Sequence, residues 1–192
     1  MDGSPITFDH RAHRELLGHL STYLTDSQRI LDAWNVYSDE NTDLDGWPHD
    51  SHAYGLRASR RDAETHTAFE PLRDGARHLL GTAETQLTLL PEGQAQTRWV
   101  YQLGLLTTAL DQLDALDQQW LETEDSLSSV TPGTPAYEDA LAEHHAEEWN
   151  ALGDWNTHGK AILEINAAAR KAPSPLAPRP ALAPTPRSRA RA

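Results

Sequence analysis

Apolar side chains recur at steps of four and three residues, and then of seven, between Gln94 and Leu127. The positions are Trp99, Leu103, Leu106, Leu110, Leu113, Trp120 and Leu127. This heptad spacing places one apolar stripe along a helix of about 33 residues, as in the seam of a coiled coil. Two positions of the stripe are carboxylates, Asp117 and Glu124, near its C-terminal end. We expect a helix over residues 94–129 that packs against partners of similar length.

An earlier stretch has the same pattern. Its apolar positions are Leu16, Leu20, Tyr23, Ile30, Trp34 and Tyr37. The stripe is interrupted at Ser27, and Thr25 to Gln28 forms a capping-box pattern that could start a second helix. We expect one continuous helix over about residues 5–38, with two shorter helices as the alternative.

Two further helices are predicted from periodicity and from proline positions. Residues 50–90 are regular in their second half, whereas Arg57 to Ala68 are almost all polar. Pro71 lies inside this helix and must kink or split it, because proline removes a backbone hydrogen bond and crowds the preceding turn. A fourth helix is predicted over residues 134–170, with Pro135 at its first position.

Four long helices joined by short turns predict an all-α fold for residues 1–170, a long antiparallel up-down-up-down four-helix bundle. Residues 171–192 differ in composition, with six prolines, five basic residues and no apolar periodicity. This segment is predicted to be a disordered, Pro/Arg-rich C-terminal tail with polyproline II character.

Charge and composition narrow the function classes. Residues 1–170 hold 11 Lys/Arg against 29 Asp/Glu, so this acidic body repels nucleic acid, and any such contact would use the basic tail with Arg187, Arg189 and Arg191. The absence of cysteine excludes disulfides, thiolate catalysis and cysteine metal sites. No secretory signal and no membrane-spanning run are recognised, so a cytoplasmic location is expected. The preference for arginine over lysine, together with the alanine content, favours a high-GC bacterial genome.

The acidic loop over residues 38–51 contains half of a calcium-binding pattern. Asn41, Asp43, Asp45 and Gly46 match the first half of an EF-hand loop. His52 stands where a bidentate Glu is needed, so calcium affinity should be lost. A solvated turn whose Asp and Ser side chains cap the next helix is the favoured interpretation.

The interruptions of the apolar stripes predict a polar layer inside the bundle. Ser27, Asp62, Asp117 and His145 all fall about 16–18 Å from the same end at 1.5 Å per residue. Helical bundles build cofactor and metal sites in such layers. A hydrogen-bonded layer that fixes the helix register is the other interpretation.

Two of the helices carry a histidine and a glutamate one turn apart. His66 and Glu70, and His144 and Glu148, have i, i+4 spacing, which places both groups on one helix face. Together with the opening Asp9-His10-Arg11, these pairs resemble the hemerythrin-like HHE family. That resemblance implies a four-helix bundle with a di-iron site, although the predicted third helix has no histidine to contribute.

The candidate metal ligands are therefore six residues, for Fe, Mn or Zn. They are His66, Glu70, Asp117, His144, His145 and Glu148. A second set of titratable residues, at the far end of the bundle, consists of His13, Asp74, His78 and His158.

Two functions remain open. The leading hypothesis is a non-enzymatic interaction protein that binds a protein partner or self-associates, because the helices are long and no catalytic signature is present. The alternative is a bundle that binds a metal or a small ligand in its polar layer. No catalytic residue and no membrane contact are predicted, and enzymatic activity is not favoured.

Overall fold

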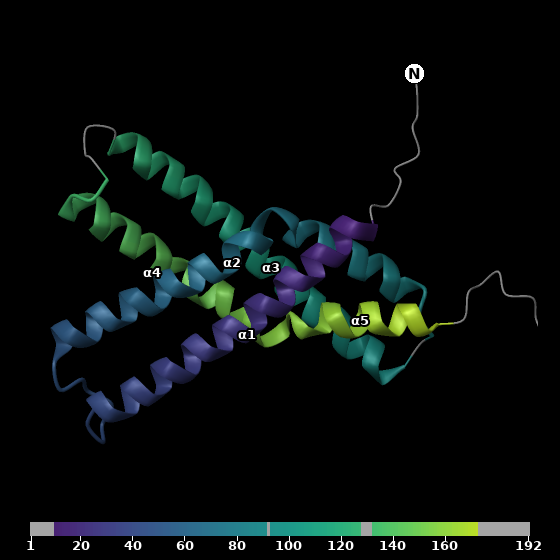
Figure 1. Cartoon of the computed structure of the whole chain (residues 1–192), viewed down its shortest axis with the longest axis horizontal. Coiled ribbons are helices and arrows are strands. Elements are labelled where there is room, and N and C mark those ends of the chain that lie inside the picture. The colour runs from purple at the N-terminus through teal and green to yellow at the C-terminus, as the bar shows by residue number, and fades with distance from the viewer. Residues whose placement is uncertain (1–9, 92, 128–131, 173–192) are drawn as a thin grey trace, which may run out of the picture.

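The computed structural model describes residues 10–91, 93–127 and 132–172, and its regular structure there is helical (Figure 1). The helices are α1 (His10–Asn41), α2 (Ser51–Thr88), α3 (Gln94–Ser126), α4 (Pro135–His158) and α5 (Lys160–Lys171). Short connections make consecutive long helices antiparallel, and α5 continues the course of α4. The predicted all-α antiparallel bundle is confirmed. Within these ranges, no helix has the length and apolar character needed to cross a bilayer.

The predicted fourth helix is divided into α4 and α5, which meet at Gly159. Gly159 separates them but keeps helical dihedral angles, and its amide donates to the carbonyl of Trp155 at 2.9 Å. A Cβ at Gly159 would lie 3.2 Å from Leu20 and 3.3 Å from Leu24, both on α1. Glycine therefore lets α1 pack closely against this break.

The expected start of the first helix and the expected tail lie outside the described residues.

The other two helix ambiguities are settled. α1 is a single helix, because the Thr25 hydroxyl donates to the Ser21 carbonyl at 3.0 Å within the helix and does not cap a new one. α2 also stays continuous through Pro71, and its ribbon changes direction partway along (Figure 1). The Pro71 carbonyl accepts a hydrogen bond of 2.9 Å from Nδ1 of His19 on α1.

The loop between α1 and α2 uses its carboxylates to hold its own backbone. Oδ1 of Asp43 accepts from the amides of Asp45 and Trp47, at 3.0 and 2.8 Å. Asp50 is the N-cap residue of α2, because its Oδ1 accepts from two backbone amides of the first turn of that helix. These bonds support the interpretation as a helix-capping turn.

The hydrophobic core occupies only one part of the bundle. Buried residues fall within 13–30 of α1, 62–87 of α2, 103–113 of α3 and 144–165 of α4 and α5. Within it, the Phe69 ring lies 5.0 Å from that of Tyr23 and 5.3 Å from that of Trp155. The Tyr23 hydroxyl donates to the Leu152 carbonyl at 2.6 Å. The predicted stripe on α3 is buried from Leu103 to Leu113 and then leaves the core.

Beyond the core, the molecule divides into two hairpins, called here the first arm (residues 31–61) and the second arm (residues 114–127 and 132–143). None of the residues described in either arm is buried. Figure 1 shows the α1–α2 end and the α3–α4 end diverging from the common body. Each arm is held by aromatic contacts between its own two helices, such as Trp34 with Tyr54 at 5.0 Å and Trp120 with Tyr137 at 5.8 Å.

Candidate functional site

A cluster of charged and imidazole side chains lies where the two arms separate. α2 contributes His66 and Arg73, which are two helical turns apart and so share a face. α4 contributes His144 and Glu148, one turn apart. Asp117 comes from α3. The spacing along each helix therefore presents all five side chains to the junction between the arms.

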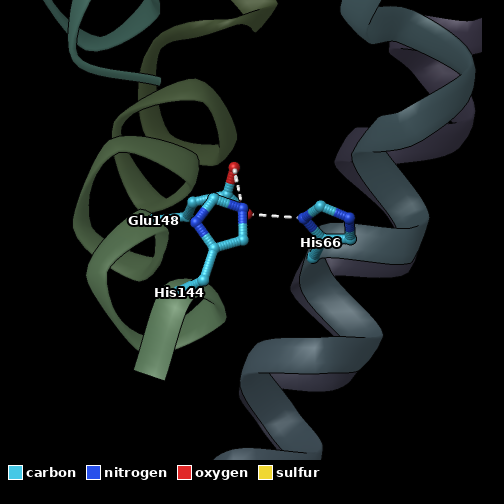
Figure 2. Close-up of side chains that lie close together, drawn as sticks. All are labelled: His66, His144 and Glu148. Atoms are coloured by element: carbon cyan, nitrogen blue, oxygen red, sulfur yellow. Dashed lines mark hydrogen bonds and ion pairs between the residues drawn. The ribbon is translucent and has the colours of Figure 1, made fainter. Parts of the chain in front are cut away.

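Glu148 is the centre of this cluster and has no exposed surface. Its Oε2 accepts from Nδ1 of His66 at 2.5 Å, and its Oε1 lies 3.7 Å from Nε2 of His144 (Figure 2). The same Oε1 also accepts from Nη2 of Arg73. Burial acts to raise the pKa of Glu148, but the hydrogen bond from His66 and the positive charge of Arg73 outweigh it and lower the pKa. Glu148 is thus a buried, ionised carboxylate.

Arg73 joins three helices. Its Nη1 donates to Oδ2 of Asp117 on α3 at 2.5 Å, while its Nη2 donates to Glu148 on α4. A planar guanidinium suits such two-sided pairing with carboxylates. The sequence analysis missed Arg73. One feature of the sequence could have indicated its role: Arg73 lies two helical turns after His66, so both side chains are on the same face of α2. In the structure that face meets Asp117, the carboxylate that interrupts the α3 stripe.

The imidazoles of the cluster lie close to one another and to an indole. The ring centroid of His66 is 4.3 Å from that of His145, and His144 stacks on Trp120 at 5.2 Å. Burial lowers the pKa of His144, and burial together with the charge of His66 lowers the pKa of His145 to about 4. Both rings are therefore neutral near pH 7, and a neutral imidazole can offer a nitrogen lone pair to a metal.

All six predicted ligand residues lie in or beside this cluster. Ligand atoms of His66, His144 and Glu148 lie within 4.8 Å of one another. Glu70 is 65% exposed, with Oε1 at 3.5 Å from Nε2 of His66. Asp117 reaches the cluster through Arg73, and His145 through the ring of His66.

The predicted single layer of stripe interruptions is only partly present. Ser27, Asp62 and His145 are buried, and Asp117 is half-buried. The Ser27 hydroxyl, however, donates to Oδ1 of Asn156 at 2.8 Å, and Asn156 lies about 16 Å along α4 from His145. Placing Ser27 in the same layer was wrong. The prediction assumed straight helices with aligned axes, whereas the axes in the structure bend and cross.

A cation–π contact of Arg61 holds the first arm to α4. The Arg61 guanidinium lies 4.3 Å from the ring centroid of Trp34 on α1 and 3.8 Å from that of Trp149 on α4. Its Nη2 is 2.6 Å from Oδ1 of Asp62. Burial raises the pKa of Asp62, and the hydrogen bond and charge of Arg61 oppose that rise.

The second predicted cluster is partly assembled. The rings of His13 and His78 lie 6.1 Å apart, and Nε2 of His13 is 3.4 Å from Oδ1 of Asn166 on α5. Asp74 is exposed and His158 is half-buried. The tail arginines Arg187, Arg189 and Arg191 lie outside the described residues.

Comparison of the chain with models of protein families, with characterised proteins and with solved structures found no match. The resemblance to the HHE family therefore rests only on the two His and Glu pairs and on Asp9-His10-Arg11.

Proposed function

We propose that this protein works by binding another protein through its two arms, and not by catalysis. The observation that carries this proposal is the lack of buried residues in both arms over the described part of the chain. Because neither hairpin has a core of its own, its residues bury little apolar surface and contribute little to the free energy of folding. Their surface is available to a partner.

The arms expose large apolar side chains, which supports this proposal. Those more than half exposed are Val36, Leu44, Trp47 and Leu56 on the first arm and Leu121 on the second. Exposed tryptophan and leucine are the residue types that anchor protein interfaces when a partner covers them.

The charge of the arms indicates the chemistry of the partner. Residues 114–143 contain eight Asp/Glu and no Lys or Arg, and residues 31–61 contain six Asp/Glu and three Arg. Such surfaces attract a basic surface and repel an acidic one, mainly through the association rate. We therefore expect a partner with basic and apolar side chains in its contact surface. The basic segment 171–192 of a second copy of the chain has the first of these properties.

Affinity capture from the source cells tests the proposal with matched variants. The arm variant carries Trp47→Ser and Leu56→Ser, and the control carries Val100→Ser and Tyr101→Ser, which remove equally exposed apolar groups from α3 outside the arms. We expect a protein retained by the wild type and the control, lost with the arm variant, and released by salt. Equal retention by both variants would refute the assignment to the arms.

Light scattering on the purified chain tests self-association separately. If the partner is a second copy bound through residues 173–192, deletion of that segment should convert a dimer into a monomer, as should the arm variant. A wild-type monomer would direct the search to a different protein.

A further inference from the structure

We propose that His66, His144 and Glu148 form a binding site for one zinc-class transition-metal ion at the junction of the arms. The ion would take a nitrogen from each imidazole and one oxygen of the carboxylate, and a fourth position would be open to water. This site does not depend on the arms binding a partner. It also differs from the di-iron centre that the HHE resemblance implies, because the three ligand atoms suffice for one ion.

The spacing of the ligand atoms supports a mononuclear site. Ligands at about 2.0–2.2 Å from a tetrahedral zinc lie about 3.3–3.6 Å from one another. In the cluster, Oε2 of Glu148 is 2.5 Å from Nδ1 of His66, Oε1 is 3.7 Å from Nε2 of His144, and all the ligand atoms fit within 4.8 Å (Figure 2). The two shorter distances end on different oxygens of Glu148, so binding one ion through a single oxygen requires the carboxylate to turn. The 4.8 Å limit on the three ligand atoms keeps that rotation small.

The donor set selects the class of metal. Two imidazole nitrogens and one carboxylate oxygen suit zinc and neighbouring divalent transition metals, whereas calcium and magnesium require mostly oxygen ligands. Two helices supply all three donors, and Glu148 and His144 are buried. Ligands held on packed helices need little ordering when the ion binds.

The approach to the site lies on the second arm. A groove between α3 and α4 is lined by Trp120, Glu143, His144 and Glu147. It brings solvent to the side of His144 and adds two carboxylates along the way. A hydrated cation can therefore reach the imidazole from this groove, and water can occupy the fourth position.

Arg73 competes with the ion for Glu148. Without metal, its guanidinium holds Oε1 of Glu148, the oxygen that faces His144. Arg73 also donates to Asp117, whose side chain is 34% exposed, so it keeps a partner after it releases Glu148. Removing Arg73 should consequently strengthen metal binding, although a purely structural role for the cluster would predict only a less stable protein.

Titration of the metal-free full chain with Zn²⁺, in competition with a chromogenic chelator, tests the site, and Co²⁺ absorption reports the geometry. We expect one tight equivalent and the intense visible absorption of tetrahedral Co²⁺. His66→Ala and His144→Ala should each weaken Zn²⁺ binding by more than about tenfold and abolish that absorption. The control His49→Ala/His52→Ala removes two exposed imidazoles, one in the α1–α2 loop and one in the first turn of α2, and should bind like the wild type.

Circular dichroism first establishes that each variant is folded. If either histidine variant unfolds, Arg73→Met provides the test, with Zn²⁺ affinity expected to rise several-fold. The proposal is overturned if the wild type has no tight equivalent, if the His49→Ala/His52→Ala control loses binding as the cluster variants do, or if Arg73→Met leaves the affinity unchanged or lowers it.

Discussion

Replacing Glu148 with glutamine removes the negative charge at the arm junction and keeps the shape of the side chain. Glu148 is fully buried and is contacted by His66, Arg73 and His144. After the substitution, the Arg73 guanidinium retains only Asp117 as a charged partner. The new amide NH₂ must also face at least one of the groups that now donate to the carboxylate. We therefore expect Glu148→Gln to destabilise the fold.

The magnitude follows from the burial of the partners. Removing one member of a buried ion pair typically costs about 3–5 kcal/mol, because the other charge is left without compensation. Arg73 is 19% exposed and keeps Asp117, so the lower end applies, about 3 kcal/mol. For a chain of this size, that corresponds to a decrease in Tm of about 6–12 °C.

Urea unfolding of the metal-free protein, followed by tryptophan fluorescence and circular dichroism, measures the effect. Glu147→Gln is the matched control, because Glu147 is the preceding residue of α4 and is exposed, and it should change stability by less than about 0.5 kcal/mol. The double variant Glu148→Leu/Arg73→Met should recover part of the loss, since apolar residues can replace a buried ion pair. A loss below about 1 kcal/mol for Glu148→Gln, or a double variant less stable than the sum of its single changes, would refute this account of the cluster.

Three further predictions use the same unfolding measurement, and the first two each have a matched control substitution. Gly75→Ala should cost about 1–3 kcal/mol, because the new Cβ would lie 2.1 Å from a methyl group of a leucine on α1, whereas Gly81→Ala has open space and should stabilise α2 by about 0.5–1 kcal/mol. Arg61→Lys should cost about 1–2 kcal/mol through the lost stacking between two indoles, and Arg60→Lys, at an exposed pair, should have almost no effect. His145 has a folded pKa of about 4 and a reference pKa of 6.5, so the unfolded chain binds the proton more readily, and stability is full above pH 6.5 and falls as the pH decreases towards 4. His145→Gln should reduce that acid-dependent loss by up to about 3 kcal/mol between pH ~7 and pH ~4, and an unchanged pH profile would contradict the prediction.

The helices could be predicted because their signals are local. The steps from Leu103 to Leu113 define a helix face, and Asp50 and Pro135 mark helix starts whose geometry the structure reproduces. Pro71 illustrates the limit of such reasoning. Its effect on its own turn is predictable, but whether α2 bends or ends there depends on packing with α1.

The divergence of the arms could not be predicted from the stripes. An apolar position indicates that a side chain has a partner, but not how many helices surround it. Trp34 and Trp120 lie on stripes that continue from the core, yet in the structure they contact the neighbouring helix of their own hairpin. Four-helix and two-helix packing require the same pattern at these positions.

The cluster was anticipated in its residues but not in its organisation. The i, i+4 pairs correctly marked the helix faces of His66 and Glu148. Heights computed along straight parallel helices placed Ser27 in the wrong layer. Arg73 was missed because an arginine near a polar stretch has the pattern of a solvated residue, and only the fold brings Asp117 opposite it.

The cluster lies where the two arms separate, so its contacts determine how the arms are oriented relative to each other. The bonds of Arg73 with Asp117 and of His66 with Glu148, and the stacking of Arg61 on Trp149, each join the α1–α2 hairpin to the α3–α4 hairpin. Charged hydrogen bonds require particular directions, whereas apolar contacts tolerate sliding. A small change at the junction is therefore enlarged at the tips, because each arm extends several helical turns beyond it. If both arms contact one partner, Glu148→Gln should weaken that binding although no residue of the arm surface changes. The exposed control Glu147→Gln should leave it intact, which separates an effect on arm geometry from one on surface charge.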